Sequence, residues 1–252
     1  MRALRELLVA AVVVAALACV PAAADITCCQ TFTNNTVNDP VNDLHLTFNP
    51  WTLTDNDWDG GVLPQLNRIV SENANTIEYR FSGGNVAKGK QATVSVTFDQ
   101  NGYGQGQTMW SVGGVAVAQA GAPFSLRGSP GTTADMWVIA LDNRDFQTTR
   151  QLIVSDLRFA ATSTIYNAHT LQSATFMWSE PRPTFAINYG AEEEFQWQTG
   201  LGAYPVLQAT LWDAEMPETT TSFVAQITPE PATMALVGFG VAGVLARRRR
   251  KM

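Results

Sequence analysis

The residues with the clearest chemical potential are three aspartates at alternate positions, Asp55, Asp57 and Asp59, which are followed by Gly60. Carboxylate oxygens two residues apart can converge on a hard cation, and a glycine in sixth place permits the sharp turn of a calcium loop. The pattern then departs from such a loop, because Leu66 stands in twelfth place, where a bidentate glutamate belongs. Two interpretations stay open: a solvated acidic turn, and a calcium site completed by other oxygens.

Two tryptophans accompany this acidic stretch. Trp58 lies inside it and Trp51 lies shortly before it. The flat apolar face of an exposed indole suits the C–H face of a sugar ring, so both are candidates for carbohydrate binding. The alternative is that these rings fold back over the end of the domain and join its core.

Residues for catalysis are few. The chain has two histidines, His45 and His169, and it lacks both Gly-x-Ser-x-Gly and His-Glu-x-x-His. Carboxylate pairs such as Asp142 with Asp145 are enough for a glycosidase in principle, but an acidic protein contains such pairs by chance. We therefore expect a non-catalytic protein with calcium as the one suggested cofactor. A carbohydrate- or calcium-binding module is the alternative, and a polysaccharide-active hydrolase is less favoured.

The C-terminal end has three consecutive parts. A Pro-Glu-Pro tripeptide at Pro229, Glu230 and Pro231 precedes an uncharged apolar run at residues 232–246. A basic cluster then follows, made of Arg247, Arg248, Arg249, Arg250 and Lys251. The run favours hydrocarbon, although as a helix it would reach only about 22 Å against a hydrocarbon core of about 30 Å. The cations resist transfer across a membrane, so we expect the end of the chain in the cytoplasm and the preceding domain outside.

This arrangement resembles the PEP-CTERM sorting signal of exopolysaccharide-producing Gram-negative bacteria, over residues 229–252. The resemblance implies recognition by exosortase, an integral membrane transpeptidase-like enzyme that removes the tail. It implies transient inner-membrane anchoring by a transmembrane helix at 232–246, followed by a place at the cell surface or outside the cell. Exopolysaccharide is then the expected partner of the released domain. An ordinary tail anchor is the alternative.

The N-terminal residues 1–24 have the three parts of a secretory signal peptide. Arg2 and Arg5 make a positive start, residues 7–18 form an apolar stretch, and small residues lead up to Ala24. Residues 25–42 are expected to form an N-terminal arm. It contains Cys28 and Cys29, for which we consider a strained vicinal disulfide, two idle thiols or an intermolecular crosslink.

The segment between the two ends is strongly acidic. Residues 25–231 hold 9 of the 16 Lys and Arg residues and 21 of the 22 Asp and Glu residues, for a formal charge of −12. Such a surface repels phosphate backbones, so the composition argues against nucleic acid as a partner. Cations or neutral polymers suit it better.

Residues 43–228 have the period-two pattern of strands with one buried face. Ala92, Val94, Val96 and Phe98 alternate with polar residues, which predicts Val96 inside and Ser95 in solvent. Similar strands are expected at 44–48, 77–82, 112–117, 136–141, 152–159, 174–178, 185–189, 194–198, 206–212 and 221–227. Many short alternating strands separated by turns predict an all-β domain, an antiparallel β-sandwich or jelly roll of roughly ten strands.

Overall fold

The computed structural model describes residues 24–37, 40–48, 55–59, 63–70, 77–98, 103–133, 135–143 and 150–229. Within these ranges the fold is all-β, with fifteen strands and one short helix. The elements are β1 (Ala24–Thr33), β2 (Asp43–Phe48), β3 (Asp55–Asp59), β4 (Gln65–Val70), β5 (Ile77–Ser82), β6 (Gln91–Phe98), β7 (Tyr103–Val112), β8 (Val115–Gly121), β9 (Phe124–Pro130), β10 (Met136–Asn143), β11 (Leu152–Thr162), α2 (Ala168–Ser173), β12 (Phe185–Ile187), β13 (Glu192–Gln198), β14 (Tyr204–Asp213) and β15 (Met216–Pro229).

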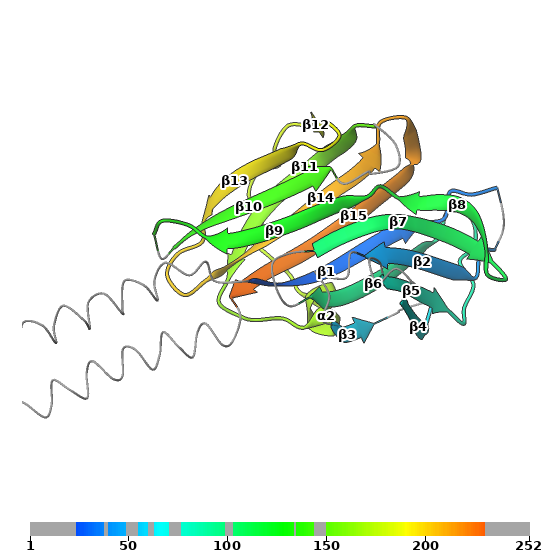
Figure 1. The fold of residues 1–252 in the computed structure, drawn as a ribbon. Helices are drawn as coiled ribbons and strands as arrows, with labels where there is room; N and C mark the ends of the chain where they lie inside the picture. Colours follow the sequence, from blue (N-terminus) through cyan, green and yellow to red (C-terminus); the bar gives the residue numbers. More distant parts are fainter. Residues whose placement is uncertain are drawn as a thin grey trace, which may run out of the picture.

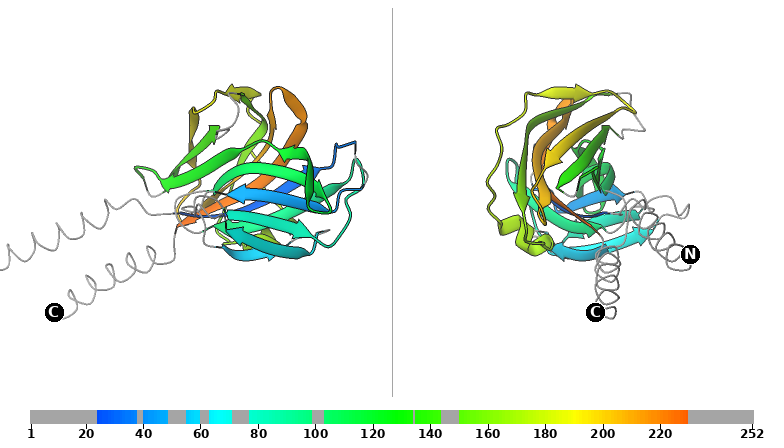
Figure 2. Two further views of the ribbon diagram at one scale, coloured as in Figure 1. Left: turned by 45° about the vertical axis from the view of Figure 1, so that its right-hand side comes forward. Right: turned by 90° about the vertical axis from the view of Figure 1, so that its left-hand side faces the viewer.

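The strands form two antiparallel sheets (Figure 1). One sheet has the order β12-β11-β14-β15-β1-β6-β3, and the other has the order β13-β10-β9-β7-β2-β5-β4 with β8 paired to β7. Successive strands often change sheet, as β1, β2 and β3 do, so neighbours in the sequence lie in different layers. The turned views show both sheets curving around a shared interior (Figure 2). The predicted all-β antiparallel fold is confirmed, and the two layers fit a sandwich.

Aromatic pairs join the two sheets across this interior. Phe124 of β9 stacks on Phe223 of β15 with ring centroids 5.2 Å apart. Phe48 of β2 meets Phe98 of β6 at 5.1 Å. All four side chains are at most 2% exposed, so they belong to one core formed by both sheets. The alternation predicted at 92–98 is confirmed, because every second side chain of β6 enters this core.

The expected N-terminal arm is instead a central strand. β1 lies between β15 and β6 and pairs with both along nearly its whole length. Its inward side chains Ile26, Cys28, Gln30 and Phe32 are at most 1% exposed. The alternation of apolar and polar residues in β1 was not evident from the sequence, because a cysteine and a glutamine occupy two of the four inward positions.

Neither Cys28 nor Cys29 forms a disulfide within the described residues, and both are buried. Adjacent residues of a strand point to opposite faces, so Cys28 enters the core while Cys29 lies on the outer face of the sheet. A vicinal disulfide is therefore absent from this strand, and burial of both side chains opposes a crosslink at the surface. Burial raises the pKa of the Cys28 thiol well above its ordinary value.

α2 packs on part of the outer face of the same sheet, and the prediction that Ser95 lies in solvent is wrong. α2 packs against β1, β3, β6 and β15, with Ala168 and Leu171 at most 2% exposed. Asn167 caps the helix by accepting a hydrogen bond from the backbone N–H of Thr170 at 2.9 Å. Ser95 points outward as predicted, yet it is 0% exposed.

Two further strand predictions were wrong. The stretch 112–117 is not one strand, because Gly113 and Gly114 have φ of +59° and +83° and form the tight turn between β7 and β8. Two positive φ values are what a two-residue hairpin needs, and glycine supplies them without strain. The stretch 174–178 has no regular structure. Pro181 and Pro183, which cannot donate in a ladder, follow closely and argue against strand pairing here.

The predicted signal peptide helix and the membrane segment at 232–246 lie outside the described residues. Among the helices that the described ranges contain, none combines the length and apolar character needed to cross a bilayer.

Candidate functional site

The C-terminal tripeptide begins at the last residue of the fold. Pro229 ends β15, a strand of 14 residues that runs between β14 and β1. It is paired with Ala24, and the preceding Thr228 is paired with Asp25. Glu230, Pro231, and the basic residues Arg247, Arg248, Arg249, Arg250 and Lys251 lie outside the described residues.

The strand holds its position through its inward side chains. Thr221, Phe223, Ala225 and Ile227 are each at most 2% exposed and alternate with outward residues. Pro229 has no backbone N–H to donate, so the ladder loses a hydrogen bond where the tripeptide begins. The sequence therefore explains both why β15 is firmly held and why it stops here.

The acidic stretch Asp55, Asp57 and Asp59 was expected to be a turn, and its backbone is strand β3 instead. β3 is the edge strand of the first sheet and pairs with β6, with a shift of register between Asp55 and Trp58. An extended backbone does not wrap around an ion as a calcium loop does. Among the described residues no group of three or more His, Cys, Asp or Glu is arranged to hold a metal ion. Because the side chains of β3 are outside the description, the calcium site stays a prediction.

The two tryptophans proposed for sugar binding are not brought together by the described structure. Trp58 is placed only through the backbone of β3, and Trp51 lies outside the described residues. Their proposed role stays a prediction.

A different group of aromatic side chains gathers on the surface, and we call Tyr166, Phe176 and Trp178 the aromatic cluster. The ring centroids of Tyr166 and Phe176 are 5.6 Å apart and those of Phe176 and Trp178 are 5.3 Å apart, both edge to face. All three are half-buried, and Met177 between them is 96% exposed. Sequence reasoning placed Trp178 in a core strand and missed the cluster.

The segment that carries Phe176 and Trp178 is firmly attached despite its irregular backbone. The N–H of Ser179 donates to the carbonyl of Phe159 at 2.8 Å, and the N–H of Arg182 donates to the carbonyl of Leu157 at 2.9 Å. The Arg182 guanidinium lies over the rings of Phe159 and Phe195 at 5.5 and 5.0 Å from their centroids. The cluster is thus held on the edge of β11.

The buried carboxylates are engaged by arginines. Asp142, 5% exposed, accepts a hydrogen bond from Ser125 and lies 3.4 Å from Arg127. Asp213, 3% exposed, accepts a hydrogen bond from Arg150 at 3.0 Å. These pairs neutralise carboxylates that would otherwise be costly to bury. Asp145, the partner considered for Asp142, lies outside the described residues.

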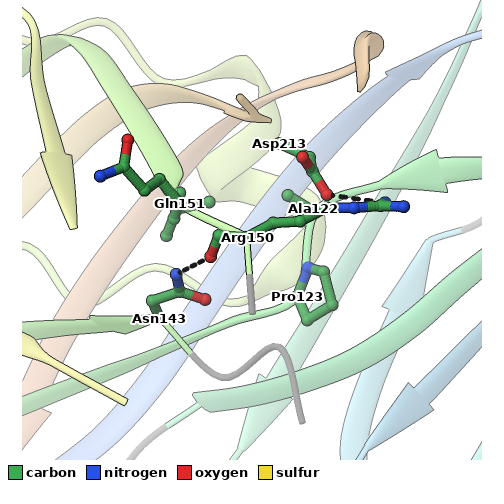
Figure 3. A pocket seen from close by; sticks show the side chains of 7 residues that line it. Ala122, Pro123, Asn143, Arg150, Gln151 and Asp213 are labelled. Atoms are coloured by element: carbon green, nitrogen blue, oxygen red, sulfur yellow. Dashed lines mark hydrogen bonds and ion pairs between the residues drawn. The ribbon is translucent and has the colours of Figure 1, made fainter. Parts of the chain in front are cut away.

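A small hollow adjoins the second of these pairs (Figure 3). Its wall includes Ala122, Pro123, Asn143, Arg150, Gln151 and Asp213. Asn143 donates to the backbone carbonyls of Arg150 at 2.8 Å and of Ile187 at 3.0 Å, so its amide is used to hold the chain in place. The hollow has room for about one water molecule. Small-molecule sites usually need about 300–1,000 Å³, so this one is too small for a sugar polymer or a substrate of similar size.

Comparison with known proteins bears on the tail. Residues 228–251 match the family model of the PEP-CTERM protein-sorting motif. Neither a curated protein nor a solved structure matches the chain. The motif implies export, transient membrane anchoring and processing by exosortase, a membrane enzyme. The resemblance drawn from Pro229, the apolar run and the basic cluster is confirmed: the C-terminal end of this chain is a PEP-CTERM protein-sorting motif.

Proposed function

We propose that the chain is a non-catalytic protein of the bacterial extracellular matrix, displayed through its tail and in contact with exopolysaccharide. The observation that carries the proposal is the sorting motif at 228–251, which begins at the end of β15 with no spacer after the folded domain. A domain joined in this way to a sorting motif is the cargo that the motif delivers.

The state of the buried carboxylates supports a non-catalytic role. A glycosidase needs one carboxylic acid with a raised pKa and a second carboxylate across a space that admits the sugar. Asp142 and Asp213 are instead each paired with an arginine, Arg127 and Arg150, so both side chains are engaged in contacts that hold the fold. Measurement of new reducing ends after incubation with the host polysaccharide tests this point, and their release would establish a hydrolase.

The aromatic cluster supports contact with a sugar polymer. Its half-buried rings present apolar surface beside polar groups on a firmly held segment, the combination that suits the C–H faces of sugars. This observation also favours the second candidate function, a dedicated carbohydrate-binding module. The predicted roles of Trp51, Trp58 and calcium are separate from this cluster.

Intact-mass measurement of the surface form tests the role of the tail. Expressed in a bacterium that has exosortase, the surface protein should lack residues 232–251. Replacement of Glu230 and Pro231 by alanine should prevent removal of the tail. The control Thr233→Ala keeps the tripeptide, and its tail should be removed as in wild type. A full tail in the wild-type surface form would contradict processing and favour a plain anchor.

Binding to purified exopolysaccharide tests the aromatic cluster. Trp178→Ala should weaken binding about tenfold, equivalent to about 1.4 kcal/mol, because it removes the largest ring. Tyr189, 45% exposed in the turn before β13, offers a matched aromatic outside the cluster, and Tyr189→Ala should bind like wild type. Equal losses in the two variants would argue against the cluster as the contact surface.

A further inference from the structure

The sorting motif begins within the last strand of the domain. Pro229 is still paired with Ala24, and Ile227, two residues earlier, is 0% exposed. Only Glu230 and Pro231 separate the strand from the apolar run that begins at Ala232. Three steps between Cα atoms span at most about 11 Å, so a tail inserted in the membrane holds this end of the domain close to the lipid.

Three of the loops at the same end of the domain as Pro229 adjoin one another, and we call these three loops the exit pole. They connect β9 to β10 at 131–133 and Asp135, β11 to α2 at 163–167, and β13 to β14 at 199–203. In Figure 1 the arrowheads of β9 and β15 both point toward this end, at the left of the molecule.

Hydrogen bonds hold these loops against the end of β15 and against one another. The side chain of Gln226 accepts from the N–H of Tyr166 at 2.8 Å and donates to the carbonyl of Thr164 at 2.7 Å. The N–H of Thr199 donates to the carbonyl of Asp135 at 2.9 Å. The loops are therefore parts of one surface around the point where the tail leaves the domain.

The exit pole is poor in charge and presents apolar side chains. Its loops contain one ionisable carboxylate, Asp135, in a domain that is otherwise strongly acidic. Two large apolar side chains of these loops are exposed to solvent, Ile165 at 62% and Leu201 at 82%. A hydrogen bond from Gln198 lowers the pKa of Asp135, which keeps this single group ionised.

The opposite end of the domain differs in composition. Lys88 and Lys90 precede β6, and Glu215 and Glu218 lie where β14 turns into β15. Residues at both places are exposed. The opposite end also exposes apolar side chains, among them Val37 and Val115, so the exit pole differs from it in having few charges and not in apolar exposure.

We propose that the exit pole is a membrane-contact surface, on which the domain rests against the outer leaflet of the inner membrane while the tail is still attached. Ile165 and Leu201 enter the head-group region there, as apolar residues of interfacial proteins do. The contact is apolar and not electrostatic, because the acidic domain has no basic patch at this pole to attract anionic lipid. The inference rests on the proposed function, since it requires the tail to anchor the chain.

Site-specific fluorescence in vesicles tests the contact. The chain that begins at Asp25 and keeps its tail is placed in vesicles of phosphatidylethanolamine and phosphatidylglycerol that contain a nitroxide-headgroup lipid. A fluorophore is attached at Leu201→Cys or, as the matched control, at Val115→Cys, which is 68% exposed in the turn region at the other end. The buried Cys28 and Cys29 leave the labelling selective under native conditions.

We expect the label at 201 to be quenched about twofold or more over the label at 115. Ile165→Glu beside the label should reduce this quenching, because a carboxylate resists entry into the head-group region. Equal quenching at 201 and 115 in chains that sediment with the vesicles would overturn the contact and leave tail anchoring intact. Failure of the chain to sediment with vesicles would overturn the anchoring step of the proposed function, and the contact with it.

Discussion

Gln226 of β15 joins the last strand to the loop that leads into α2, and its removal is expected to destabilise the domain markedly. The side chain is 1% exposed and makes two hydrogen bonds, from the N–H of Tyr166 at 2.8 Å and to the carbonyl of Thr164 at 2.7 Å. Gln226→Ala removes both bonds. The two backbone groups lose their partner at a partly buried position, where water replaces it poorly.

The magnitude follows from these contacts. A hydrogen bond contributes about 0.5–1.5 kcal/mol net, and a buried group left without a partner costs about 1–3 kcal/mol. Because Tyr166 and the loop are only partly buried, we expect a loss of about 2–4 kcal/mol in the free energy of unfolding. For a domain of this size each kcal/mol lowers Tm by about 2–4 °C, so the expected decrease in Tm is roughly 4–16 °C.

Urea and thermal denaturation followed by circular dichroism measure this loss. Gln208→Ala is the matched control, because Gln208 is half-buried and donates to the more exposed Asp156 at 3.1 Å. Gln226→Glu keeps the shape but places a carboxylate against the carbonyl of Thr164. Its deficit relative to wild type should narrow as the pH falls, since the protonated acid can donate to that carbonyl. A loss in Gln226→Ala no greater than in Gln208→Ala would refute the reasoning.

Two further predictions concern β6 and β1. Val96→Asp and Ser95→Asp should each lower the free energy of unfolding by several kcal/mol, because both sites are at most 4% exposed. Gln91→Asp, at the exposed start of β6, should be tolerated. A wild-type Tm for Ser95→Asp would mean that Ser95 is not covered on the outer face of the sheet. Cys28 and Cys29 should resist alkylation in the native protein and both react in denaturant, as mass spectrometry can show. Because the folded state raises the pKa of Cys28, its contribution to stability is complete below the ordinary thiol pKa of 9.0 and declines as the pH rises beyond it. Cys28→Ala should remove that decline, and an unchanged slope would contradict the assignment.

Local pattern in the sequence was enough to predict several strands. β2, β5, β6 and β10 all have apolar residues at every second position, and the structure places strands over those residues. The all-β fold followed from the same pattern, because a strand with one buried face imposes a period of two on its own sequence. The sorting motif was equally readable, since an uncharged run between Pro229 and a basic end is a property of composition alone.

Strands whose inward positions hold polar residues were missed. In β1 the inward set includes Cys28 and Gln30, so the apolar count is too low to signal a strand. In β3 the series from Asp55 to Asp59 has the composition of a turn, and its backbone is extended because β6 offers it an edge to pair with. Whether such a segment becomes a strand depends on the strand that it pairs with. That partner is distant in the sequence, so a short stretch of sequence does not reveal it.

The sequence by itself determined the fold class, several of the strands and the C-terminal sorting motif. Only the tertiary structure decided which surfaces exist. It showed that α2 packs on the face where Ser95 is buried and that Tyr166, Phe176 and Trp178 gather on one edge. It also showed that Ala24 meets Pro229 beside three loops with a single carboxylate. The physical reason is that the alternation of apolar and polar residues along a strand shows which side chains face the core. It does not show which segment packs against the other face of the sheet. That cover comes from segments far away in the chain, and their positions depend on the packing of the whole domain.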